Sequence, residues 1–142
     1  MVIPDINGDW KGIIFFGESY GNEAGEQLGF ELVLQQENHK IEGIATDTEG
    51  WGASPDPASV FGTFNGRKLT FIKQYLTRHF YVGEQMFIDD TQLGPEIYYS
   101  GKYNKHNDTF AGEWAFRVAK KSLGFIPYYT TEGDGTWTMQ RK

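Results

Sequence analysis

The chain has 142 residues, 39% of them hydrophobic and 23% charged, so it has the size of a single domain, residues 1–142, with a core of its own. Its formal net charge of -6 argues against nucleic acid as a partner, because binding to a phosphate backbone depends on Lys and Arg. The absence of cysteine excludes disulfides and cysteine-ligated metals, and it fits a reducing compartment such as the cytoplasm.

The frequent Gly and aromatic residues favour short strands and many turns over long helices. The N-terminal residues lack the basic region and apolar stretch of a secretory signal. No apolar segment approaches the roughly 20 residues that cross a bilayer. The sequence therefore predicts a soluble, cytoplasmic protein with no membrane insertion.

Alternating apolar and polar residues predict the first hairpin within residues 30–47. Phe30, Leu32 and Leu34 share one face of its first strand, because successive side chains of a strand point to opposite sides. Residues 37–40 form the predicted turn, and the partner strand completes the range.

A loop rich in Gly, Pro and Asp is predicted over residues 48–57. Trp51 is unusual in such a loop, so we expect it to cover another part of the protein. The clearest hairpin signal follows at Asn65-Gly66, a dipeptide that accepts the positive φ angles of a type I′ turn. Its strands are predicted at residues 60–64 and 69–75.

The second half of the chain continues this pattern. Residues 80–88 form a predicted strand that ends at Asp89 and Asp90. A hairpin follows, with strands at residues 97–103 and 109–118, and a closing strand is predicted at residues 135–141.

Helical signals are weak: residues 117–124 support only a short turn, because Gly124 and Pro127 prevent a longer helix. Successive hairpins with short turns instead predict an antiparallel up-and-down meander of about eight or nine strands. Closure into a barrel is favoured over a sandwich, because a closed barrel has no exposed edge strands. Glycines inside the predicted strands fit tightly coiled barrel walls and leave space for neighbouring aromatic rings; they are Gly43, Gly62, Gly101 and Gly112.

Short glycine and tryptophan motifs along the chain resemble those of a known superfamily. Gly8-Asp9-Trp10 is similar to the motif that begins the first strand of lipocalins and avidin-like proteins, which are calycin β-barrels. Residues 99–103, 110–114 and 135–137 resemble their later glycine and tryptophan strands. The resemblance implies a ligand-binding barrel in which Trp10 packs at the closed end beneath Arg141. The biotin-contacting residues of avidins have no identifiable counterparts, so biotin binding is not implied.

Lys73 is the most informative polar residue of the predicted barrel. Leu69, Phe71, Lys73 and Tyr75 share one strand face, so an inward Leu69 and Phe71 place the Lys73 ammonium inside as well. A buried ammonium requires a carboxylate or a ligand anion to offset its desolvation. One interpretation is functional: Lys73 anchors an acidic ligand group beside Tyr75 and Tyr99.

The same pattern has a purely structural interpretation, in which Lys73 reaches water at the barrel rim or pairs with Asp47 or Glu113. The inward aromatic residues are also ambiguous, because a barrel of about eight strands either encloses one small ligand or is filled by side chains. The candidate ligand-binding residues are Phe71, Lys73, Tyr75, Tyr99, Trp114 and Phe116.

No catalytic motif or metal site is predicted, and no cofactor. His39 and His106 fall in predicted turns, where exposed histidines are common, and no histidine pair has a metal-ligand spacing. His79 is the best candidate for a haem ligand or general base, although a solvated histidine at a strand end is favoured. Adjacent Asp89 and Asp90 point to opposite faces of a strand and cannot share a substrate there.

Three function classes fit these residues. The first is a non-enzymatic barrel that binds a small apolar or amphipathic ligand. The second is a filled barrel that acts as an interaction or structural module, including a homo-oligomer, through exposed aromatics at Trp51 or residues 125–129. The third is an enzyme with its acid and base at the barrel mouth, drawn from Lys73, Tyr75, His79 and nearby carboxylates.

Overall fold

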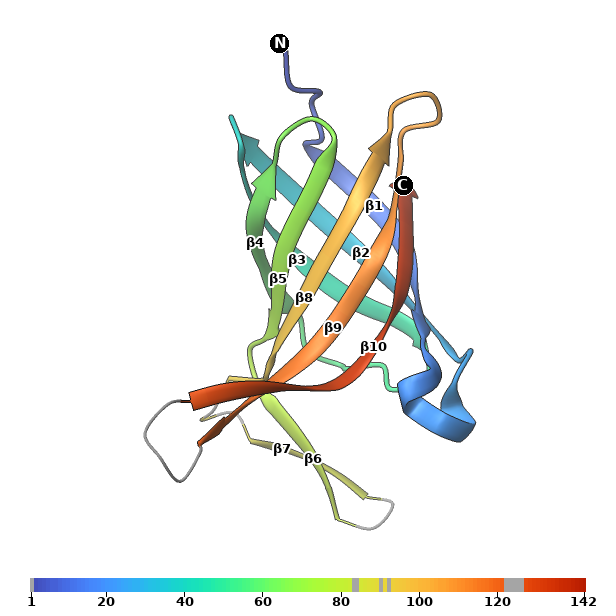
Figure 1. Ribbon diagram of the computed structural model, residues 1–142, viewed down its shortest axis with the longest axis vertical. Coiled ribbons are helices and arrows are strands. Elements are labelled where there is room, and N and C mark those ends of the chain that lie inside the picture. The colour runs from blue at the N-terminus through green and yellow to red at the C-terminus, as the bar shows by residue number, and fades with distance from the viewer. Residues whose placement is uncertain (1, 83–84, 90, 92, 122–126) are drawn as a thin grey trace.

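A computed structural model describes residues 2–82, 85–89, 91, 93–121 and 127–142 (Figure 1). For residues 78–81, 86, 117–121 and 127–132 only the backbone is described. The elements in chain order are β1 (Gly8–Phe16), the 3-10 helix η1 (Glu18–Glu23), β2 (Gln27–Glu37), β3 (Lys40–Gly50), β4 (Ala58–Phe64), β5 (Lys68–Tyr75), β6 (Arg78–Val82), β7 (Gln85–Asp89), β8 (Glu96–Asn104), β9 (Thr109–Lys121) and β10 (Pro127–Arg141).

Eight of these strands form a closed antiparallel barrel in the order β1-β10-β9-β8-β5-β4-β3-β2 (Figure 1). The first strand closes the barrel by pairing with both β2 and β10, so that Trp10 lies opposite Leu32 on one side and Arg141 on the other. The all-β meander barrel predicted from the sequence is therefore confirmed. Burial follows the expected alternation, with Phe30, Leu32 and Leu34 all in the core.

The predicted single strand over residues 80–88 is wrong. The chain forms two strands there, β6 and β7, which pair only with each other and project from one end of the barrel (Figure 1). The wall has no place for them, because β5 pairs directly with β8. The Gly94 amide donates to the Tyr75 carbonyl at 2.9 Å, so the chain returns to the wall beside the point where it left.

Two local expectations also need correction. Residues 117–121 belong to β9 and are not a helical turn, whereas residues 18–23 form the unpredicted η1. The hairpin at Asn65-Gly66 is present, but a type I′ turn needs two positive φ angles and here only Gly66, at 96°, has one. Asn65 instead closes the turn with its side chain, whose oxygen accepts hydrogen bonds from the Lys68 and Arg67 amides at 2.7 and 2.9 Å.

The N-terminal segment closes the end of the barrel at which β1 begins. Ile6 is fully buried, and its carbonyl accepts a hydrogen bond from Trp10 Nε1 at 2.9 Å. The Arg141 guanidinium lies 4.6 Å from the centroid of the Trp10 ring and donates to the backbone carbonyls of Asp5 and Asn7. Arg141 also pairs with Asp108, so this end is held by stacking, hydrogen bonds and charge together.

Aromatic side chains fill the interior next to this end. Phe110 packs against Trp10 and Phe64, with ring centroids 5.3 and 5.6 Å apart. Trp137 lies over Gly101, where an added Cβ would come within 2.6 Å of the indole. Gly101 therefore has the role expected from the sequence, since the Trp137 ring occupies the space that a side chain would need.

Candidate functional site

The interior of the opposite half contains a buried ion pair. Lys73 on β5 and Asp47 on β3 both point inward, and Lys73 Nζ lies 3.4 Å from Asp47 Oδ1. Lys73 therefore pairs with Asp47, one of the two carboxylates that the sequence suggested, whereas Glu113 is exposed on the outside of β9. The pair bridges the inner faces of two strands that are not neighbours, because β4 separates β3 from β5 in the wall.

Asp47 has further hydrogen-bond donors besides Lys73. The Tyr75 hydroxyl lies 2.9 and 2.8 Å from its two carboxylate oxygens, and the Ser54 amide donates to Oδ2 at 2.8 Å. These contacts tie the loop after β3 to the interior. They also cover the carboxylate completely, since the exposed fraction of the Asp47 side chain is 0%.

The Lys73 ammonium lies among aromatic rings. Its Nζ is 5.0 Å from the centroid of Tyr75, 5.8 Å from Phe30 and 5.9 Å from Tyr99. Such contacts partly replace the lost hydration of a cation. Burial nevertheless lowers the pKa of Lys73, while the negative charge of Asp47 acts in the opposite direction.

Burial also raises the pKa of both tyrosines beside the ion pair. For Tyr75 and Tyr99 desolvation is the largest cause, and the negative charge of Asp47 adds to it. Both hydroxyls therefore stay protonated at neutral pH, so each has a proton that it can donate in a hydrogen bond.

Two hydrogen-bond donors in this cluster, Lys73 and Tyr99, are incompletely paired by the described residues. An ammonium carries three N–H groups, yet Lys73 forms one hydrogen bond, the 3.4 Å contact to Asp47. The Tyr99 hydroxyl forms none with the described part of the chain, although Tyr99 is only 4% exposed. No described, fully buried side-chain polar atom lacks a partner, so this hydroxyl must retain accessible surface.

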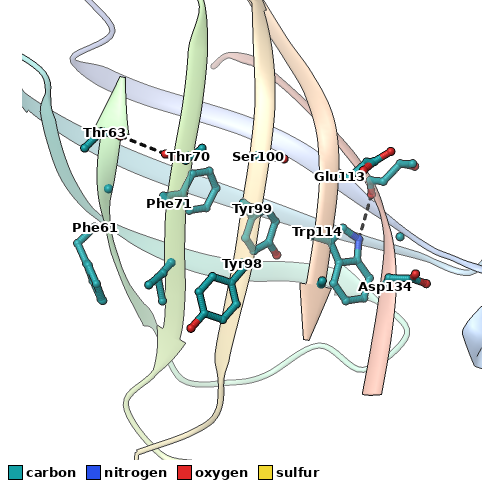
Figure 2. A pocket seen from close by; sticks show the side chains of 15 residues that line it. Phe61, Thr63, Thr70, Phe71, Tyr98, Tyr99, Ser100, Glu113, Trp114 and Asp134 are labelled. Atoms are coloured by element: carbon teal, nitrogen blue, oxygen red, sulfur yellow. Dashed lines mark hydrogen bonds between the residues drawn. The ribbon is translucent and has the colours of Figure 1, made fainter. Parts of the chain in front are cut away.

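The predicted ligand-binding residues therefore fall into two groups. Lys73 and Tyr75 contact Asp47, and the Tyr99 ring lies 5.9 Å from Lys73 Nζ. Phe71 belongs to the same group because its ring stacks on Tyr99 with centroids 4.6 Å apart; Figure 2 shows both residues. Trp114 lies on β9 with its indole N–H already donating to the backbone carbonyls of Phe15 and Thr136, and Phe116 packs partly buried against the core.

An aromatic cluster lies at the end of the barrel where β1 finishes. Phe16 contacts Trp51, Tyr20 and Trp114 edge to face, with ring centroids 4.8, 4.9 and 5.5 Å apart. Trp51 is 42% exposed, and it covers Phe16 and Tyr20 as its unusual loop position suggested. We refer to Phe16, Tyr20, Trp51 and Trp114 as the mouth cluster.

Sequence reasoning did not single out Tyr20 or Ser54, and it named Asp47 only as one of two alternatives. A signal for Asp47 was present, because Ile41, Ala45 and Asp47 occupy alternate positions that face inward on β3. The positions of Tyr20 and Ser54 depend on η1 and the loop after β3, which have no hydrophobic periodicity.

A separate groove of about 840 Å³ lies on the outer side of the wall. Its outward-facing lining includes Phe61 on β4, Tyr98 on β8 and Glu113 on β9. Figure 2 shows these three residues on the same part of the wall as Tyr99, whose side chain points inward. A hydrogen bond of 3.0 Å between the hydroxyls of Thr63 and Thr70 crosses the same surface. The groove also borders the inward residues Phe71, Tyr99 and Trp114, so it lies on the other side of the same wall from the interior cluster.

The other candidate residues do not join the cluster. His39 and His106 are exposed in turns. His79 lies in β6, but its side chain is outside the described residues, as are Asp90 and Phe125. Among the described residues, no group of three His, Asp or Glu side chains could hold a metal ion.

Comparison with known proteins gives no match to a family model, to a curated protein or to a solved structure. The closed eight-stranded antiparallel barrel is consistent with a calycin-like fold in general. In the part of the chain that the structure describes, no helix is long and apolar enough to cross a bilayer.

Proposed function

We propose that this chain is a non-enzymatic cytoplasmic binding barrel of the lipocalin-like or avidin-like type, which holds a small amphipathic molecule beside Lys73. The observation that carries the proposal is a pair of inward donors in the barrel interior: Lys73 makes one hydrogen bond, to Asp47, and the Tyr99 hydroxyl makes none with the described residues. A donor without a full set of acceptors is costly in an apolar interior, and a polar ligand group removes that cost.

Two further features support this location. The opposite end is closed by Ile6 and by Arg141 over Trp10, which leaves the mouth cluster as the end for ligand entry. A buried ion pair also stabilises a fold less than well-packed apolar side chains of similar volume do. The charges of Lys73 and Asp47 are therefore better explained by recognition than by stability.

Native mass spectrometry of the protein, combined with thermal shifts across a panel that contains fatty acids, haem and biotin, tests the proposal. We expect a retained or added small molecule that raises the melting temperature. Asp47→Asn/Lys73→Met should abolish binding while leaving the buried site uncharged, whereas Lys68→Met, which removes an exposed lysine of the same strand, should bind normally.

A protein that has no bound mass and shows no thermal shift with any probe would overturn the proposal. The same spectra report the oligomeric state. Concentration-dependent self-association without ligand, lost on replacing exposed Trp51 by Glu, would favour the interaction module instead.

A further inference from the structure

Two incompletely paired hydrogen-bond donors, the Lys73 ammonium and the Tyr99 hydroxyl, lie in the barrel interior. Asp47, the nearest acceptor, already has contacts from Lys73, the Tyr75 hydroxyl and the Ser54 amide, and its side chain has no exposed surface. The Lys73 side chain retains 3% exposure, and the Tyr99 hydroxyl donates to no described residue. An ammonium can only donate, so a ligand group that satisfies Lys73 must be a hydrogen-bond acceptor, and the Tyr99 hydroxyl can donate to the same group.

The two donors lie near each other, because Lys73 Nζ is 5.9 Å from the centroid of the Tyr99 ring. Phe71 pairs with Tyr99 across β5 and β8, and Lys73 is two residues farther along β5 on the same face. Side chains in this diagonal relation lie within reach of one another when they are long. A carbonyl oxygen has two lone pairs and can accept from the ammonium and the hydroxyl together.

The charges of the site already balance. Asp47 and Lys73 are the described buried residues that carry charge, one negative and one positive. A ligand carboxylate would add a second negative charge and leave it without a counterion in a desolvated site, which is unfavourable. An uncharged acceptor leaves the balance unchanged, so charge balance favours a neutral ligand over the acidic group suggested by the sequence.

The surroundings of the donors are aromatic. Phe71 and Tyr99 stack nearly parallel, at 9°, and Phe30 faces Lys73 from β2. Flat rings pack favourably against such faces. The ligand body that suits the site is therefore a ring system and not a flexible chain.

From these observations we infer that the ligand is an uncharged ring compound with a carbonyl oxygen that accepts hydrogen bonds from Lys73 Nζ and the Tyr99 hydroxyl. This inference rests on the proposed binding function and specifies the chemical class of its ligand. It requires that adding a negative charge to the ligand weakens binding.

Three probes of nearly equal shape test the inference by isothermal titration: methyl naphthyl ketone, naphthoate and ethylnaphthalene. We expect the ketone to bind about tenfold more tightly than the hydrocarbon, because it gains hydrogen bonds, and more tightly than the carboxylate. In Tyr99→Phe the advantage of the ketone over the hydrocarbon should fall severalfold, while the affinity for the hydrocarbon should stay the same.

A separate protein variant tests the role of charge in ligand choice. Asp47→Asn removes the negative charge, so the carboxylate should then bind better than the ketone, provided that circular dichroism shows a folded barrel. Glu113→Gln, which removes an exposed carboxylate on the outside of β9, should leave the original order of the probes.

The outcomes separate the two levels of the argument. Naphthoate binding as tightly as the ketone to the wild-type protein, or an unchanged ketone advantage in Tyr99→Phe, overturns the ligand class and leaves the binding function standing. Failure of all three probes, together with no bound mass in native spectra, overturns both.

Discussion

The ion pair between Lys73 and Asp47 makes a quantitative prediction for stability. Lys73→Met keeps a similar side-chain volume but leaves the fully covered Asp47 carboxylate without its counterion. Breaking a buried pair in this way costs about 3–5 kcal/mol. Because the Tyr75 hydroxyl and the Ser54 amide still donate to Asp47, we expect a loss near the lower limit, about 3 kcal/mol.

The double variant Asp47→Asn/Lys73→Met distinguishes a charge effect from a packing effect. It removes both charges and keeps an acceptor for the Tyr75 hydroxyl and the Ser54 amide. Its free energy of unfolding should therefore lie within about 1 kcal/mol of the wild-type value. The double variant would then be about 2 kcal/mol more stable than Lys73→Met, which is the non-additivity expected of partners in direct contact.

Urea unfolding followed by tryptophan fluorescence measures these differences, provided that the slopes of the transitions agree among variants. Lys68→Met on the same strand is the control and should change stability by less than about 0.5 kcal/mol, because Lys68 is exposed. The reasoning is refuted if Lys73→Met is as stable as Lys68→Met, or if the double variant is as unstable as the single one.

Three further predictions concern individual side chains. Burial holds the pKa of Tyr99 above its ordinary value of 10.0, so above about pH 10 the folded state keeps a proton that the unfolded state releases. In urea unfolding, the free energy of unfolding of the wild-type protein should therefore fall by about 1.4 kcal/mol per pH unit more than that of Tyr99→Phe. Arg141→Ala removes the stacking on Trp10 and two hydrogen bonds to backbone carbonyls, and it should lower stability by about 2–3 kcal/mol in calorimetry. Gly101→Ala places a methyl group 2.6 Å from the Trp137 indole and should destabilise the barrel by about 1–3 kcal/mol in the same measurement.

Each of these predictions has a matched outcome that contradicts it. Parallel pH profiles of the wild type and Tyr99→Phe would mean that Tyr99 ionises in the folded barrel. Lys142→Ala removes an exposed ion pair with Glu31 and should cost under about 1 kcal/mol, so an equal loss in Arg141→Ala would contradict its structural role. Thr136→Ala, on the outside of the wall, is the control for Gly101→Ala. An equal loss of stability in both variants would contradict the steric role of Gly101.

The sequence predicted the parts of this fold that depend on local pattern. Leu69, Phe71 and Lys73 alternate inward on β5, and the inward lysine follows from that alternation alone. The carboxylate that pairs with Lys73 could not be identified from this alternation. Asp47 lies 26 residues earlier, and its distance from Lys73 depends on the barrel diameter and the register of three strands.

The errors have a related physical cause. Residues 80–88 have strand propensity, but whether a strand enters a barrel depends on which neighbours remain unpaired, and β8 already occupies the edge of β5. The turn at Asn65 was misassigned because an Asn side chain can either adopt a positive φ or accept backbone hydrogen bonds itself. Dipeptide statistics do not separate these two uses.

The two ends of the barrel differ in a way that bears on function. At the Trp10 end, the N-terminal segment and Arg141 satisfy their polar groups with one another, and the aromatic rings leave little accessible surface. At the other end, a covered carboxylate and two incompletely satisfied donors face the interior below the mouth cluster. A barrel selected for stability alone would gain by replacing Lys73 and Asp47 with apolar side chains, because desolvation of the two charges outweighs much of their attraction. The presence of both charges beside incompletely satisfied donors is therefore the physical reason to seek a ligand at this end.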